Sequence, residues 1–251
     1  MRIGNQKVTW IAASCGVLAA AAPTLASWTL GNGDTVNMAD VFAEGSDRTV
    51  YINDKVFVFE SAASAHFELR DITLVGFIST ATNGHGFRNV GFDLVGGFGD
   101  AMPGDGVISE MNLQYQVSVN QSAYEQGLRL CDARLTFNGS SYGIGSYARV
   151  DETILDLDTN TFLGGLAVYD NSGPPRDTRY VDMKDFCEGT TNGAAQGFRA
   201  FEVNKNLKFL APGEHDAASA SFIRQEFSQV PAPGAIALLG LAGLASRRRR
   251  G

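Results

Sequence analysis

Apolar and polar residues alternate with a period of two over much of the chain, which is the pattern of half-buried β-strands. The clearest run covers residues 111–119, and its apolar positions are Met111, Leu113, Tyr115, Val117 and Val119. Every residue between them is Asn, Gln or Ser. This run therefore predicts an antiparallel strand with one buried and one solvated face. Runs with a related pattern cover 72–77, 131–137 and 201–209.

Short turn-forming pairs separate these runs, and they include Asn83-Gly84, Gly96-Gly97, Pro103-Gly104, Asn138-Gly139, Gly164-Gly165 and Pro212-Gly213. The pair Asn138-Gly139 predicts a tight hairpin turn. About nine or ten strands at this spacing predict an all-β fold, an antiparallel β-sandwich of jelly-roll-like type. We expect one short helix over 37–42. Residues 217–229 fit either a helical stripe or a last strand, and we take the strand.

The N-terminus has the three parts of a secretion signal in order. Residues 1–7 carry Arg2 and Lys7, and residues 11–22 form an apolar helix-forming run. Thr24 and Ala26 then place small residues for cleavage before Ser27. Residues 1–26 are thus predicted to be a signal peptide that signal peptidase removes, which predicts export across the inner membrane.

The C-terminus, residues 230–251, forms a second distinct segment. It contains Pro231, Ala232, Pro233 and Gly234, an apolar run over 235–245, and Arg247, Arg248, Arg249 and Arg250. Eleven apolar residues form a helix of only about 16 Å, short of the roughly 30 Å hydrocarbon core. We expect this short hydrophobic helix to insert transiently into the membrane, with the arginines on the cytoplasmic side.

A Pro-x-Pro element, a short apolar helix and a terminal arginine cluster together resemble the PEP-CTERM sorting signal. Exosortases process that signal in Gram-negative bacteria that make extracellular polysaccharide. The resemblance implies that the tail is removed near Pro231–Gly234 and that the protein reaches the cell envelope, the cell surface or the extracellular matrix. Ala232 stands where the namesake motif has Glu, which leaves the processing enzyme open.

Residues 27–229 form the predicted β-sandwich domain, and several of its segments resemble a recurrent domain of PEP-CTERM proteins. These segments are 37–42, 52–57, 131–135, 148–153 and 219–228. The resemblance implies a β-sandwich and brings no catalytic residues with it.

Without the two ends, the chain has 14 basic residues against 27 acidic ones. Such an acidic body does not suit nucleic acid, although it suits solubility or the binding of cations. Cys15 lies in the signal, so Cys131 and Cys187 remain in an oxidising compartment. We expect them to form a disulfide, and two buried thiols are the alternative.

Two motifs could carry chemistry. Residues 139–143 match G-x-S-x-G around Ser141, and His215 follows in hydrolase order. A nucleophile elbow needs a helix after the serine, but β-type alternation continues there, so we interpret the motif as a hairpin loop. Asp156, Asp158 and Asn160 have the spacing of calcium ligands. The rest of an EF-hand loop is missing, which leaves a looser calcium site or a solvated hairpin.

The favoured hypothesis is a non-enzymatic surface or matrix protein, associated with exopolysaccharide and without a cofactor. A carbohydrate-binding module is the second hypothesis, and it would need exposed aromatic side chains aligned on one sheet face. The third is a secreted hydrolase, which would need convergent carboxylates or a Ser–His pair. The first leads because the two ends predict a location while the body predicts no chemistry.

Overall fold

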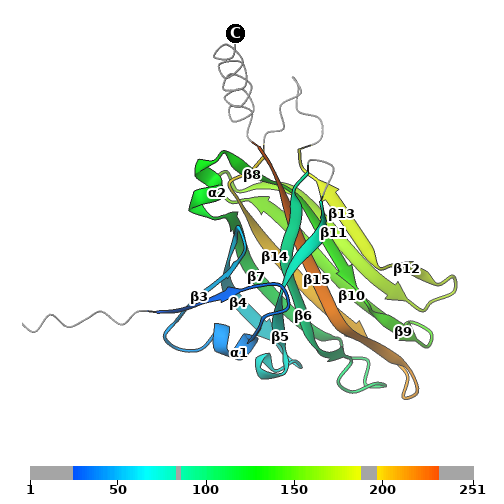
Figure 1. The fold of residues 1–251 in the computed structure, drawn as a ribbon. Helices are drawn as coiled ribbons and strands as arrows, with labels where there is room; N and C mark the ends of the chain where they lie inside the picture. Colours follow the sequence, from blue (N-terminus) through cyan, green and yellow to red (C-terminus); the bar gives the residue numbers. More distant parts are fainter. Residues whose placement is uncertain (1–24, 83–85, 188–196, 232–251) are drawn as a thin grey trace, which may run out of the picture.

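A computed structural model describes residues 25–82, 86–187 and 197–231 (Figure 1). The predicted signal helix and the tail beyond Pro231, with Ala232, Pro233, Gly234 and Arg247 to Arg250, lie outside these residues. Among the described residues, no helix has the length and apolar character needed to cross a membrane.

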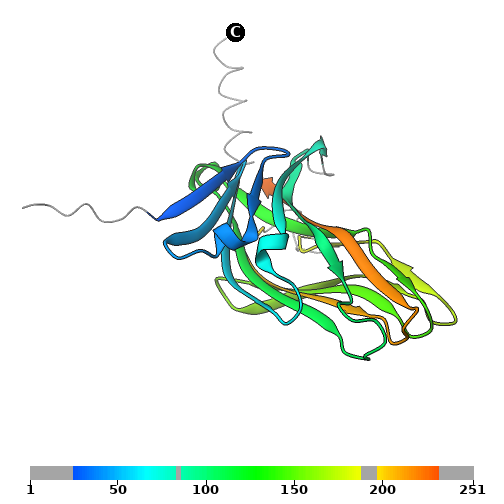
Figure 2. The same ribbon diagram turned by 90° about the horizontal axis from the view of Figure 1, so that it is seen from below.

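The fold is the predicted antiparallel β-sandwich. The order of the eight-stranded sheet is β1 (Ala26–Leu30), β3 (Ser46–Ile52), β4 (Lys55–Ser64), β7 (Ser109–Val119), β14 (Ala200–Leu210), β10 (Tyr147–Asp156), β11 (Thr161–Asn171) and β12 (Asp177–Arg179). Only the β1–β3 pair in this sheet is parallel. Figure 2 shows the strands gathered in two layers, with the N-terminal strands, coloured blue, on one side.

The order of the seven-stranded sheet is β13 (Val181–Asp185), β8 (Leu128–Phe137), β15 (Ala217–Pro231), β6 (Arg88–Gly99), β5 (Thr73–Thr82) and β2 (Thr35–Asn37), and β9 (Ser140–Tyr142) also pairs with β15. The described residues thus contain more strands than the pattern predicted. The additional strands include β2, β9 and β12, which have three residues each and are too short to show a period of two.

Two local predictions are confirmed. The helix expected over 37–42 is α1 (Met38–Val41), where the side chain of Asn37 accepts a hydrogen bond from Ala39 N at 2.8 Å as the N-cap. Residues 217–229 form strand β15. Two further short helical elements are the 3₁₀-helix η1 (Leu69–Asp71) and α2 (Gln121–Glu125).

The predicted hairpin turn at Asn138-Gly139 is wrong. Strands β8 and β9 on either side of it both pair with β15, so they follow one another along the same edge. Asn138 Oδ1 accepts hydrogen bonds from Ser221 N and Phe222 N at 2.9 and 3.0 Å, which bridges the interruption. The chain then crosses to the other sheet as β10.

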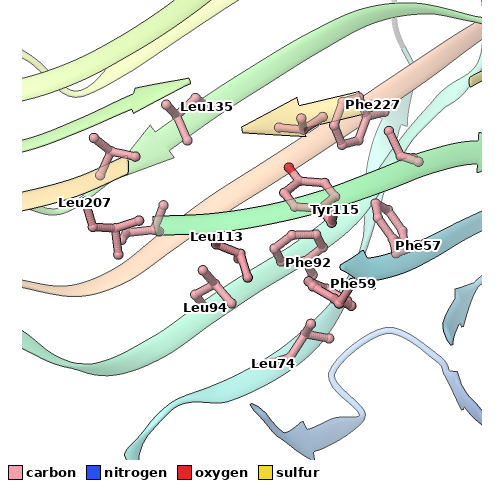
Figure 3. Close-up of a cluster of buried hydrophobic side chains, with 14 of the residues drawn as sticks. Phe57, Phe59, Leu74, Phe92, Leu94, Leu113, Tyr115, Leu135, Leu207 and Phe227 are labelled. Carbon is pink, nitrogen blue, oxygen red and sulfur yellow. The ribbon is translucent and has the colours of Figure 1, made fainter. Parts of the chain in front are cut away.

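The core lies between the sheets and is rich in aromatic side chains (Figure 3). Phe57 and Phe59 of β4 and Tyr115 of β7 meet Phe92 of β6, and all four are essentially unexposed. The Phe57 and Phe92 rings meet edge to face with centroids 5.2 Å apart. The inward positions predicted for 111–119 are therefore confirmed.

Cys131 and Cys187 form the predicted disulfide, with their Cα atoms 5.4 Å apart. The alternation in 131–137 placed Cys131 on the inward face of its strand. It is buried, but it packs in a small separate cluster with Cys187 and Val230. The pairing of β8 with β15 shifts register between Asp132 and Leu130, and such a bulge redirects the residue that it contains.

Candidate functional site

The outward side of the eight-stranded sheet, which we call the open face, is formed by β4, β7, β14, β10 and β11. Strand alternation places the core residues of β7 and β14 inward and every second residue outward. The strand register then aligns the outward residues in rows. One row is Ala63, Asn112, Asn206, Asp151 and Ala167, and the next is Ser61, Gln114, Asn204, Thr153 and Gly165.

The polar residues of these two rows form the floor of a hollow of about 340 Å³. The outward residues that line it are Ser61, Asn112, Gln114, Asp151, Thr153, Asn204, Asn206 and Lys208. Longer side chains occupy the three central strands, while Ala63, Gly165 and Ala167 on the flanking strands are small. Neighbouring strands are about 4.8 Å apart and alternate residues about 6.8 Å apart, so the two rows on the three central strands span about 10 by 7 Å.

Hydrogen bonds fix the amide side chains of the floor. Gln114 Nε2 and Asn204 Nδ2 both donate to Glu202 Oε1, at 2.9 and 3.2 Å. Asn206 Nδ2 and Asn112 Nδ2 donate to Glu110 Oε1, at 2.6 and 3.5 Å. Two carboxylates at the margins of the hollow thus orient four amides.

A charged and aromatic group lies beside the hollow. Arg149 donates to both carboxylate oxygens of Asp151, at 2.7 to 2.8 Å. The hydrogen bonds that Arg149 donates to Asp151 raise the pKa of Arg149 above its ordinary value, although partial burial opposes them. Two guanidinium groups lie near the ring of Tyr169: that of Arg149 is 5.6 Å from the ring centroid, and that of Arg179 is 5.8 Å from it. Burial, followed by the charge of Glu110, raises the pKa of Tyr147.

This arrangement suits binding by hydrogen bonds more than acid–base chemistry. Asp151 is the single acid that lines the hollow, and its two oxygens are occupied by Arg149. Tyr142, Tyr147 and Tyr169, whose rings could stack on sugars, do not form one line. Tyr147 and Tyr169 lie on β10 and β11, whereas Tyr142 lies on β9 in the other sheet.

Ser141 lies in strand β9 and not in a hairpin loop, so that interpretation of the G-x-S-x-G motif is wrong. The prediction that it is no nucleophile elbow is confirmed, because a turn and strand β10 follow it. Its hydroxyl donates to the backbone carbonyl and to Oδ1 of Asp170, at 2.8 and 3.1 Å. His215 lines the same surface hollow as Ser141, but in the described part of the chain no hydrogen bond joins the two side chains.

Asp170 anchors the neighbourhood of Ser141 from a buried position. Arg176 and the hydroxyl of Tyr180, the latter at 3.0 Å, both donate to its carboxylate. Burial tends to raise the pKa of Asp170, but the hydrogen bonds from Arg176, Tyr180 and Ser141 outweigh it and bring the pKa below its ordinary value. The serine hydroxyl therefore stabilises an ionised aspartate, which is a structural role.

The suggested calcium ligands lie at the turn between β10 and β11. Asp156 Oδ1 accepts from Asp158 N at 3.2 Å and Oδ2 from Thr159 Oγ1 at 2.5 Å. Asn160 takes the left-handed conformation with φ of 54°. The Asp156 carboxylate thus organises the turn, and calcium binding by these residues stays a prediction.

Two of the predicted processing residues are described. Ala26 opens the edge strand β1, where its N–H donates to Gly45 O at 3.1 Å. Pro231 ends β15, opposite Leu128. Both predicted cleavage positions therefore lie at the ends of strands.

The open face itself was missed from the sequence. The Asn and Gln positions in 112–116 and 204–206 read as the solvated sides of two strands. The available signal was that these outward positions hold mainly Asn and Gln, where Ser, Thr or Lys would serve equally well on a solvated strand. The sequence could not show that the two runs lie side by side.

No protein-family model matches the chain, and no curated protein matches it. Among solved structures, similarity extends to the carbohydrate-binding module CBM27-1 of Caldicellulosiruptor saccharolyticus in complex with mannohexaose, at 11% identity over 62% of this chain and 81% of that chain, with a TM-score of 0.27. It also extends to a cellulase derived from Cel12A of Rhodothermus marinus, at 8% identity over 70% and 99%, with a TM-score of 0.25. A DUF4465 family protein from Bacteroides caccae matches at 7% identity over 77% and 92%, with a TM-score of 0.26. At these scores the likenesses carry no argument about function.

Proposed function

We propose that this protein is an exported, non-enzymatic β-sandwich of the cell surface or extracellular matrix that binds extracellular polysaccharide through its open face. The observation that carries this proposal is the hollow floored by Asn112, Gln114, Asn204 and Asn206 on the two adjacent strands β7 and β14. Amide groups each offer two donors and one acceptor, so a grid of them matches the hydroxyl groups of a sugar. Binding on the face of a sheet also suits a long chain, which a closed pocket could not admit.

The two terminal segments of the chain support the proposed location at the cell surface or in the extracellular matrix. The predicted signal peptide of residues 1–26 brings the chain to the exosortase-type system, and the PEP-CTERM-like tail of residues 230–251 is removed there. Loss of both segments leaves the acidic domain outside the inner membrane, where exopolysaccharide is the abundant polymer. Signal peptidase and an exosortase-like enzyme are thus transient partners, and the polysaccharide is the lasting one.

The test is binding of the mature exported chain to a panel of bacterial and plant polysaccharides, measured by affinity electrophoresis with and without calcium. We expect retardation by at least one glycan. The double variant Asn204→Ala/Asn206→Ala should lose it, because both amides belong to the floor. Thr136→Ala, on the outward side of β8 in the other sheet, is the matched control and should bind as wild type. Unchanged binding by the double variant, or no binding to any glycan, would refute the proposal.

A further inference from the structure

The open face presents amide and carboxylate oxygens that accept no hydrogen bond among the described residues, and these oxygens bear on which glycan the face binds. Each of the amides described above directs an N–H group at a carboxylate: Gln114 and Asn204 at Glu202, Asn112 and Asn206 at Glu110. Gln116 does the same towards Glu60. One of the two N–H groups of each amide is therefore used within the face itself.

The matching acceptors remain available. Within the described residues, the amide oxygens of Asn112, Asn204 and Gln116 accept no side-chain or backbone hydrogen bond. Asn206 Oδ1 is buried and likewise has no partner there. A buried carbonyl oxygen without a donor costs free energy, whereas the amide oxygens of the other three side chains are open to a ligand that brings an N–H or O–H group.

The charges on the face point the same way. Glu60, Glu110 and Glu202 form no ion pair with any basic residue in the described ranges. The basic residue nearest to the floor on β10, Arg149, is neutralised by Asp151. Lys208 remains as the one basic side chain that lines the hollow through an outward position. The face is therefore net negative, on a domain that is itself acidic.

We propose that the open face selects glycans that carry free amino groups and rejects glycans that carry carboxylate or sulfate groups. This inference rests on the proposed function. A protonated amine brings three donors and a positive charge, so it forms charge-assisted hydrogen bonds with the free oxygens of Glu110 and Glu202 and with the amide oxygens between them. The carboxylate or sulfate groups of an anionic sugar would be repelled by the unpaired glutamates of the face. They would also bring hydrogen-bond acceptors to oxygens that themselves need donors.

The experiment is titration calorimetry of the mature chain with three oligosaccharides of matched length: a deacetylated glucosamine oligomer, its N-acetylated counterpart and a uronic acid oligomer. We expect the amino oligomer to bind about tenfold more tightly than the acetylated one, with an advantage that shrinks at high salt. The uronic acid oligomer should show no binding. Equal or tighter binding of the acetylated or acidic oligomer would overturn the inference but leave the proposed function standing. No binding of all three would also overturn the inference, and the polysaccharide panel then decides the proposed function.

Variants separate recognition from general attraction to an acidic protein. Glu110→Gln and Glu202→Gln keep the side-chain shape and remove the charge, so each should lose most of the preference for the amino oligomer over the acetylated one. Glu44→Gln removes the same charge from an exposed turn outside the face and should keep the preference in full. If all three variants weaken amino oligomer binding equally, the attraction is unspecific and the inference is wrong.

Discussion

A buried ion pair within the eight-stranded sheet, hydrogen-bonded to a residue of the other sheet, provides a sharp test of what stabilises the fold. Lys205 of β14 points inward, and its Nζ donates to Glu152 Oε2 at 2.6 Å and to Gln225 Oε1 at 2.8 Å. Both charged side chains are completely buried. The second carboxylate oxygen of Glu152 has no partner among the described residues, so the charge of Glu152 depends on Lys205.

Lys205→Met removes this partner while keeping the length and apolar body of the side chain. Burial raises the pKa of Glu152, and at present the charge and hydrogen bond of Lys205 oppose that effect. Without Lys205, Glu152 must stay unpaired or take up a proton. Breaking a buried pair in this way costs about 3–5 kcal/mol of the free energy of unfolding. With a urea m-value of about 2 kcal/mol/M, the urea midpoint should fall by about 2 M.

The variant should also acquire a characteristic pH dependence. Folded Glu152 would hold a proton that the unfolded chain releases above its ordinary pKa of about 4.3. The folded state then binds more protons than the unfolded state, so stability falls as pH rises. The slope is about 1.4 kcal/mol per pH unit, until pH passes the raised pKa of Glu152. Urea titrations at several pH values, followed by circular dichroism, measure both effects.

The double variant Lys205→Met/Glu152→Leu is the control, because it leaves no charge buried. It should regain most of the stability that Lys205→Met lost, although Gln225 is left without its donor at a cost of about 1 kcal/mol. The reasoning is refuted if Lys205→Met costs less than about 1 kcal/mol, or if the double variant is no more stable than the single one.

Three further predictions concern other parts of the sandwich. Replacing both Cys131 and Cys187 by Ser opens a loop with a sequence separation of 56 and should lower the free energy of unfolding by about 4 kcal/mol, as measured by urea titration. Gly91→Ala would place a Cβ atom 1.7 Å from a backbone carbonyl oxygen of β15, so thermal denaturation should show a loss of more than about 3 kcal/mol. Arg176→Gln removes the main cause of the lowered pKa of Asp170. Wild type loses stability as pH falls through that pKa, and the variant should lose less stability over the same pH range.

Each of these has a control. A reducing agent should lower the midpoint of wild type but leave the variant without cysteines unchanged. Gly97→Ala lies on the same strand with open space around its Cβ position and should be close to wild type. Arg179→Gln alters an exposed arginine that contacts Asp182 and should keep the acid dependence of wild type. A loss as large in Gly97→Ala as in Gly91→Ala, or an unchanged acid profile in Arg176→Gln, would contradict the respective prediction.

The local sequence was enough for the fold class and for several elements. Alternation over 111–119 predicted a strand, its buried face and its solvated face correctly, because strand geometry ties burial to residue parity whatever the partner strand is. The short helix after Asn37 was predictable for a similar reason, since an N-cap acts within a few residues. Asn138-Gly139 misled because its hairpin signal assumes that the flanking strands pair with each other, and here both pair with β15 instead.

The sequence by itself determined the alternating pattern and the sandwich that follows from it. Its two terminal segments also predict where the protein is located. Only the tertiary structure decided that Asn112 lies beside Asn206, and that Lys205, at an inward position of its strand, meets Glu152 and Gln225. The physical reason is that strand pairing joins segments far apart in the sequence. Backbone hydrogen bonds are the same for any two strands, so the local sequence does not specify which strands pair. The hollow and the ion pair exist only after that choice is made.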